Sequence, residues 1–179
     1  MNVFKRIVGH FSTVTRHRHQ VIKYCAKAGI LWQGLRHDLS KYTITEFIPG
    51  VKYYTGKRSP NEGERESLGY SKAWMHHKGR NKHHFEYWVD YNVKTKRSEP
   101  VVMPYNYVAE MFCDRVAASK IYNGKDYKQT FPLEYFERRR SHRSINPVTS
   151  MEIEKLLVML AEEGEDKTFK YIRKRLKEK

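Results

Sequence analysis

Cysteine and long apolar runs are both scarce in this sequence. Its 179 residues include only two cysteines, Cys25 and Cys113, and they lack a C-x-x-C spacing. Neither a disulfide framework nor a cysteine zinc site is therefore expected, and both thiols are interpreted as reduced core residues. No run approaches the ~20 apolar residues of a membrane span, and the N-terminus lacks the apolar core of a signal peptide. These absences predict a cytoplasmic protein with no membrane association.

Acidic residues are few relative to basic ones. The sequence has 35 Lys and Arg against 20 Asp and Glu, which gives a formal net charge of +15. Such an excess attracts anions, so the expected partners are phosphorylated small molecules, nucleotides among them, or nucleic acid. Charge alone does not separate these classes. A hydrophobic content of 39% with 13% aromatic residues is typical of a folded globular protein. The length fits one domain over residues 1–179.

Strand signals are also missing, because no segment alternates apolar and polar residues and no Asn-Gly hairpin signal occurs. Helical periodicity recurs instead. Short helical segments are expected after Thr43, where Glu46 suggests a capping box, and after Asn81. Longer helices are expected over residues 3–28, 64–77, 104–122, 132–139, 149–163 and 166–179, with loops at 55–63 and 91–103. The prediction is an all-α bundle of about seven to eight helices, with helices from 130–179 packing on a site-bearing core at 10–122.

Two apolar helix faces carry polar residues that need an explanation. His10 and His17 both lie on the core-facing stripe of the first helix. They are about 10 Å apart along the helix axis, too far to bind one ion together, and core packing is the commoner role for either ring. Asp114 interrupts the apolar face of the 104–122 helix. A buried carboxylate requires a cation, for which Arg115 is one candidate, or a metal ion.

A third polar feature is the dipeptide His37-Asp38 within GLRHDLSKY. Adjacent helical residues diverge by about 100°, yet both can reach one ion beside the helix edge. Together with His17 and Asp114, the dipeptide supplies two imidazoles and two carboxylates. Such a set suits a divalent transition metal and leaves positions open for water and substrate.

The order of these motifs resembles the HD superfamily of metal-dependent phosphohydrolases. The likeness rests on His17 with Val21 four residues later, then GLRHDLSKY, then CDRVAAS in a late helix. Longer strings such as MPYNYVAEMFCDRVAASKIYNGKDY also resemble an uncharacterised family of small bacterial and phage proteins. The superfamily resemblance implies an all-helical core, a mononuclear or dinuclear metal centre and, usually, hydrolysis of phosphate esters. A minority of the superfamily are diiron oxygenases.

Two histidine doublets, His76-His77 and His83-His84, fall where dinuclear members of the superfamily carry extra histidines. Their seven-residue offset would turn one ring of each inward in a continuous helix, but Gly79 argues against continuity. His77 and His84 are assigned as metal ligands. His76 and His83 are assigned as catalytic candidates, because a free imidazole can protonate a leaving group near neutral pH.

The leading hypothesis is therefore a phosphohydrolase. His17, His37, Asp38 and Asp114 would hold one divalent ion, and Asp38 would bridge to a second held by His77 and His84; manganese, iron, nickel, magnesium and zinc are not distinguished. The catalytic candidates are Asp38, Lys41, His76, His83, Arg80 and Arg115, with Lys41 and Arg80 neutralising phosphate charge. One alternative is a diiron oxygenase acting on a small polar substrate. Another is a basic, non-enzymatic nucleic-acid-binding protein whose histidines are structural.

Overall fold

The long first helix follows directly from its sequence. In the computed structural model, which describes residues 1–138 and 143–178, α1 spans Val3–Ala28. The Asn2 side chain caps its start by accepting a hydrogen bond from the Lys5 amide, and Gly29 ends it with a φ of 83°, a conformation that glycine adopts without strain. The apolar stripe of α1 faces the core, with Val21, Cys25 and Ala28 fully buried.

Helices dominate the described part of the chain. Three short 3-10 turns join them: η1 (Leu39–Tyr42), η2 (Phe85–Tyr87) and η3 (Gly124–Asp126). The nine α-helices of the described residues are α1, α2 (Leu31–Arg36), α3 (Ile44–Lys52), α4 (Pro60–Leu68), α5 (Lys72–Lys78), α6 (Tyr105–Asn123), α7 (Phe131–Arg138), α8 (Pro147–Glu163) and α9 (Glu165–Lys177). The predicted all-α class is confirmed.

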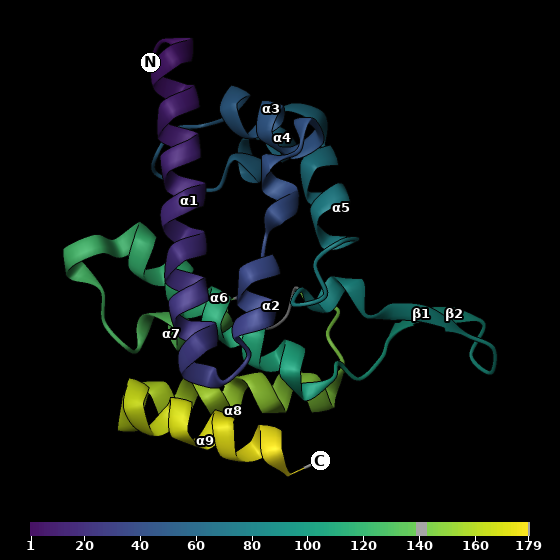
Figure 1. Ribbon diagram of the computed structural model, residues 1–179. Helices are drawn as coiled ribbons and strands as arrows, with labels where there is room; N and C mark the ends of the chain where they lie inside the picture. Colours follow the sequence, from purple (N-terminus) through teal and green to yellow (C-terminus); the bar gives the residue numbers. More distant parts are fainter. Residues whose placement is uncertain (139–142, 179) are drawn as a thin grey trace.

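The hydrophobic core lies where α1 and α6 meet the last two helices. Figure 1 shows α8 and α9 lying across the C-terminal end of α1, with α6 beside it. Core side chains include Val21 and Tyr24 from α1, Phe112 from α6, Leu157 from α8 and Phe169 from α9. Helices α8 and α9 both contact α6, and α9 also contacts α1. Among the described residues, no helix is both long enough and apolar enough to cross a membrane.

Several local predictions in the middle of the chain were wrong. Residues 64–77 form two helices rather than one, because Gly69 adopts a φ of 79° and the Ser71 side chain caps a new helix, α5. The loop expected at 55–63 ends early, since α4 begins at Pro60. The expected capping box is absent, because the Thr43 side chain makes no capping bond at the start of α3. The Thr43 hydroxyl instead donates to the Ser40 carbonyl oxygen.

A small β-hairpin was also not predicted. Strand β1 (Val89–Asn92) pairs antiparallel with β2 (Arg97–Pro100), in a register that sets Val89 opposite Pro100. The hairpin projects away from the helices (Figure 1), and its strands are largely exposed, so no apolar alternation marks them. The helix predicted over 132–139 corresponds to α7, while its expected end at Arg139 lies outside the described residues.

Candidate metal centre

Six candidate ligand residues gather around the carboxylate of Asp38: His17, His37, His77, His83, His84 and Asp114. His17 Nε2 lies 3.0 Å from Asp114 Oδ1 and 3.9 Å from Asp38 Oδ2. His37 Nε2 lies 3.5 Å from the same Asp38 oxygen and 3.6 Å from Asp114 Oδ1. These four residues come from α1, the end of α2, the start of η1 and α6. We call this group the first position.

The other oxygen of Asp38 faces the histidine doublets. Asp38 Oδ1 lies 3.2 Å from His77 Nε2 and 3.5 Å from His83 Nε2. His84 completes the group, with its Nε2 atom 2.9 Å from His77 Nε2. We call Asp38, His77, His83 and His84 the second position; their ligand atoms all lie within 4.8 Å of one another. Asp38 therefore has one oxygen at each position, as a bridging carboxylate requires.

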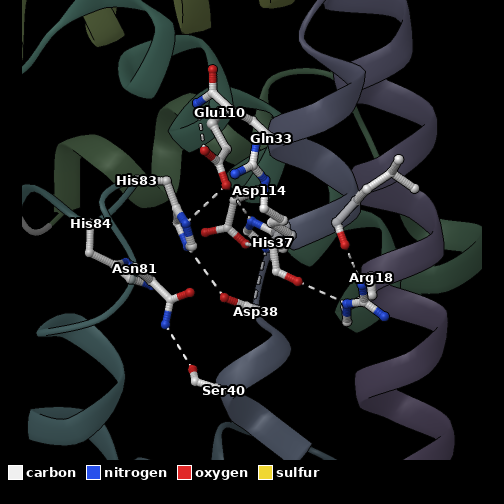
Figure 2. A network of polar contacts seen from close by, with 12 residues as sticks. Arg18, Gln33, His37, Asp38, Ser40, Asn81, His83, His84, Glu110 and Asp114 are labelled. Carbon is white, nitrogen blue, oxygen red and sulfur yellow. Dashed lines mark hydrogen bonds and ion pairs between the residues drawn. The ribbon is translucent and has the colours of Figure 1, made fainter.

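Two buried glutamates hold the histidine rings from behind. Glu110 Oε1 lies 3.0 Å from His37 Nδ1 and 3.2 Å from His83 Nδ1, as Figure 2 shows. Glu46 lies 2.8 Å from His77 Nδ1 and 2.7 Å from His76 Nδ1. A carboxylate at Nδ1 fixes the proton there, so Nε2 keeps a free lone pair for a metal. His37, His83 and His77 all present Nε2 to Asp38 for this reason.

The backbone at the His-Asp dipeptide is unusual. Asp38 has a φ of 54°, in the left-handed region that non-glycine residues rarely adopt. Arg18 of α1 fixes the preceding turn by donating to the carbonyl oxygens of His37 at 2.8 Å and Leu35 at 2.9 Å. Figure 2 shows this contact on the side of the turn away from the histidines. Strained residues of this kind persist where the surroundings hold them, often at functional sites.

The cluster contains buried polar atoms whose hydrogen-bonding capacity is unused. Among the described residues, His37 Nε2, His83 Nε2 and Asp38 Oδ1 are buried without a hydrogen-bond partner. Burial of an unsatisfied polar atom costs about 1–3 kcal/mol, so three such atoms at one point are unfavourable in isolation. A divalent cation would use all three as ligands. The chemistry of the residues present therefore fits a metal ion.

The contacts within the cluster shift the pKa values of its carboxylates and imidazoles. Burial acts to raise the pKa of Asp38, but His37, Lys41 and His77 outweigh it and hold the pKa well below its usual value. Burial acts to lower the pKa of His37, yet Asp38, Asp114 and Glu110 raise it well above 6.5. At His84, burial together with His83 and His77 depresses the pKa well below 6.5. Burial and Lys41 act to lower the pKa of His77, but Asp38 and Glu46 raise it. Metal binding would thus displace the second ring proton, at Nε2, from His37 and His77, but meet a neutral His84.

A cavity of about 230 Å³ opens onto the cluster. Five candidate ligands, His17, Asp38, His77, His84 and Asp114, lie in its wall. It extends along α1 as far as His10, roughly 10 Å from His17 at 1.5 Å per residue. The remaining wall includes the cationic Lys41 and Arg58 and the aromatic Tyr54, Trp74 and Tyr122. The candidate ligands are therefore accessible to a small molecule.

The other sequence candidates occupy different places. Lys41 lines the cavity, with Nζ 3.5 Å from Asp38 Oδ2. His76 points at Glu46 rather than at the ions' expected position, and His83 lies among the candidate ligands instead of standing free as an acid. Arg80 is not part of the cavity wall and donates to the His76 carbonyl oxygen.

Arg115 and His10 also lie apart from the cluster. The Arg115 guanidinium lies over the Phe136 ring, 5.4 Å from its centroid, and is not part of the cavity wall. Asp114 forms ion pairs with His17 and His37. His10 packs against Phe47 and Tyr54, so of the two α1 histidines only His17 belongs to the cluster.

Sequence reasoning missed both glutamates. Glu46 was interpreted as part of a capping box, whereas its side chain is buried against the histidines. Glu110 was overlooked although a signal existed: it lies four residues before Asp114, on the same face of α6. A second carboxylate one turn from a suspected ligand is a recognisable pattern for a residue that orients metal-binding histidines.

A family model matches residues 6–159 of the chain, and its description is a family of unknown function, DUF5662. The chain belongs to DUF5662. All candidate ligands of both positions, and Glu46 and Glu110 behind them, fall inside the matched segment. No HD-domain family model matches the chain, so the resemblance to that superfamily remains an expectation from the order of the sequence motifs. No curated protein and no solved structure matches the chain.

Proposed function

We propose that the protein is a metal-dependent phosphohydrolase that cleaves a small phosphate ester, such as a nucleotide, with one or two divalent ions. The observation that carries this proposal is the arrangement around Asp38, whose two oxygens each face a separate group of imidazole Nε2 atoms. Ions bound there would lower the pKa of a bound water and polarise a phosphoryl oxygen.

The side chains of the cavity suit a phosphorylated substrate. Burial would lower the pKa of Lys41, but Asp38, Asp114 and Glu46 raise it, so its ammonium group stays charged at neutral pH. Lys41 gives the wall a cation that can neutralise phosphate oxygens, and Arg58 gives a second cation that also forms a bidentate ion pair with Glu66. The three acidic residues of the wall, Asp38, Glu46 and Asp114, all lie within ion-pair distance of histidines. Their negative charges are therefore offset by the histidines and do not repel a phosphate group in the cavity.

A phosphoester panel tests this proposal. The purified full chain is stripped of metal, reloaded separately with manganese, iron, nickel, magnesium or zinc, and assayed for phosphate release from nucleotides and sugar phosphates. Asp38→Asn is the inactive control, and Arg80→Ala, which changes a residue outside the cavity wall, is the matched active control. Metal-dependent release by wild type and Arg80→Ala, but not by Asp38→Asn, supports the proposal.

The same experiment separates the alternatives. Substrate-dependent dioxygen uptake that requires iron, with no phosphate release, would assign the cluster to a diiron oxygenase. Salt-dependent binding of DNA or RNA that survives chelation and the Asp38→Asn substitution would assign the basic charge to a nucleic-acid partner. Either outcome contradicts the phosphohydrolase proposal.

A further inference from the structure

Apart from Asp38, which lies between the two positions, Glu110 is the one carboxylate in the described part of the molecule that contacts a histidine of each candidate ion position. Its Oε1 atom lies 3.0 Å from Nδ1 of His37, a first-position residue, and 3.2 Å from Nδ1 of His83, a second-position residue. Glu110 is only 5% exposed, so the contacts are shielded from water. Glu46, in contrast, contacts only the doublet His76 and His77. The two glutamates therefore differ in how many positions they support.

A polar pair from α2 and α6 fixes the orientation of Glu110. Gln33 Nε2 donates to Glu110 Oε2 at 2.8 Å and to the Asn106 carbonyl oxygen at 3.4 Å. Gln33 Oε1 accepts from Asn106 Nδ2 at 3.1 Å. If the Gln33 amide were turned over, its oxygen would face the Asn106 carbonyl oxygen. Both carboxylate oxygens of Glu110 thus face N–H donors. The side chain at position 110 must therefore accept hydrogen bonds at both of its terminal atoms.

We propose that Glu110, oriented by Gln33, is a positioning residue shared by both ion positions, and that its loss weakens the two positions in parallel. The inference rests on the metal centre of the proposed function. By accepting a hydrogen bond from Nδ1 of His37 and of His83, Glu110 keeps the ring proton on Nδ1 and the Nε2 lone pair directed at Asp38. The Oε1 atom of Glu110 thereby orients one histidine of the first position, His37, and one of the second, His83.

The substitution Glu110→Gln tests this arrangement sharply. Because Gln33 presents its N–H group, the introduced amide must turn its oxygen toward Gln33 and its NH₂ group toward the histidines. That NH₂ group needs the Nδ1 lone pairs of His37 and His83, which places the ring protons on Nε2. The substitution preserves size but reverses the hydrogen-bond polarity that both rings receive.

A compensating double variant distinguishes positioning from a general structural role. In Gln33→Glu combined with Glu110→Gln, the carboxylate at position 33 accepts from the introduced amide, whose oxygen then faces the two histidines again. The same carboxylate oxygen also faces the Asn106 carbonyl oxygen, to which Gln33 Nε2 donates in wild type, so the expected recovery is partial. Asn106 Nδ2 keeps an acceptor at position 33. Metal binding should therefore recover in the double variant relative to Glu110→Gln alone. Glu46→Gln is the matched single-position control, because the histidines that Glu46 contacts, His76 and His77, are not part of the first position.

The experiment is a titration of the metal-free full chain with Zn²⁺ in competition with a chromophoric chelator, with circular dichroism to check folding. Wild type should bind two ions. Glu110→Gln should weaken both by about 10- to 100-fold, the usual effect of removing a residue that orients a ligand. Glu46→Gln should weaken one ion only, and the double variant should regain about tenfold at both positions.

Specific outcomes overturn the inference. A folded Glu110→Gln protein that keeps both affinities, or loses only one, contradicts it, as does a double variant that recovers nothing. If Glu110→Gln does not fold, Gln33→Ala replaces it, and the two affinities must still fall together. A wild-type protein that binds no ion contradicts the proposed function itself, whereas normal wild-type binding with an insensitive Glu110 variant contradicts this inference alone.

Discussion

The two ion positions share Asp38 but are built on different kinds of scaffold. The first position takes His17 from the 26-residue helix α1 and Asp114 from the 19-residue helix α6, both of which enter the hydrophobic core. The second takes His77 from the seven-residue helix α5, and His83 and His84 from the turns that follow it. Long helices anchored in a core place ligands more rigidly than short segments do. We therefore expect the first position to be the tighter one.

The largest effect should come from Asp38, because it belongs to both positions. Asp38→Asn retains the shape of the side chain and tolerates the left-handed backbone, but it removes the charge that two ions would share. We expect affinity for both ions to fall by more than about a hundredfold, with phosphate release abolished. Metal analysis after gel filtration measures the first effect. Retention of one tightly bound ion by this variant would show that the carboxylate does not bridge.

The two positions can next be separated by one substitution in each. Asp114→Ala should remove the first ion and, because the first position orders the centre, also weaken the second. His84→Ala should remove only the second ion. Stoichiometry from isothermal titration with Mn²⁺ distinguishes the variants: one weak ion is expected for Asp114→Ala and one tight ion for His84→Ala. The reverse order of tightness would contradict the view that core helices make the better position.

Acidity should affect the two positions differently. His37 in the first position has a pKa raised well above 6.5, and His77 in the second also has a raised pKa, so an ion at either position must displace a proton. The other two imidazoles of the second position, His83 and His84, have lowered pKa values and are already neutral. Because the pKa of His37 is the more strongly raised, affinity at the first position should begin to fall at a higher pH as the solution is acidified. Metal titrations of Asp114→Ala and His84→Ala across pH measure the two positions separately, and the same pH of onset for both variants would contradict this assignment.

The pKa shifts of Asp38 and His37 also make the stability of the metal-free protein depend on pH. The lowered pKa of Asp38 contributes stability above its ordinary value of 3.8, which is lost as pH falls through the folded value. The raised pKa of His37 contributes stability below its ordinary value of 6.5, which is lost as pH rises through the folded value. Metal-free protein should thus lose this stabilisation on the alkaline side, while Mn²⁺-loaded protein should not. Thermal unfolding across this range compares the two.

The smallest expected effect concerns packing beside the cavity. A Cβ atom at Gly50 would lie 2.2 Å from His10 Nε2, so Gly50→Ala must displace the ring and should destabilise the fold by about 1–3 kcal/mol. Gly79→Ala is the matched control, because its Cβ atom would meet nothing closer than 3.4 Å and its φ is −74°. Urea unfolding measures both. An equal loss for the two variants would show that His10 moves freely.

Sequence periodicity predicted the rigid half of the site better than the other half. His17 and Asp114 interrupt apolar stripes on long helices, where the period of 3.6 residues fixes the side-chain direction. The doublets lie on a short helix and irregular turns, so no period applied, and the assignment of one inward ring per doublet missed the inward position of His83. Glu46 could not be found from the sequence, since its role depends on which rings the tertiary fold brings to it, whereas the four-residue spacing of Glu110 and Asp114 on one helix was a usable signal that was overlooked.

The left-handed conformation of Asp38 has a consequence for how the chain can change. A φ of 54° places this residue where asparagine or glycine fits with little or no strain and where most other side chains add about 1–3 kcal/mol. The backbone itself thus favours replacements that would silence the bridging carboxylate and leave the fold intact. A single substitution at this position could therefore convert a metal-binding protein of this family into a stably folded one that binds no metal. Such a protein would keep the cavity for another purpose.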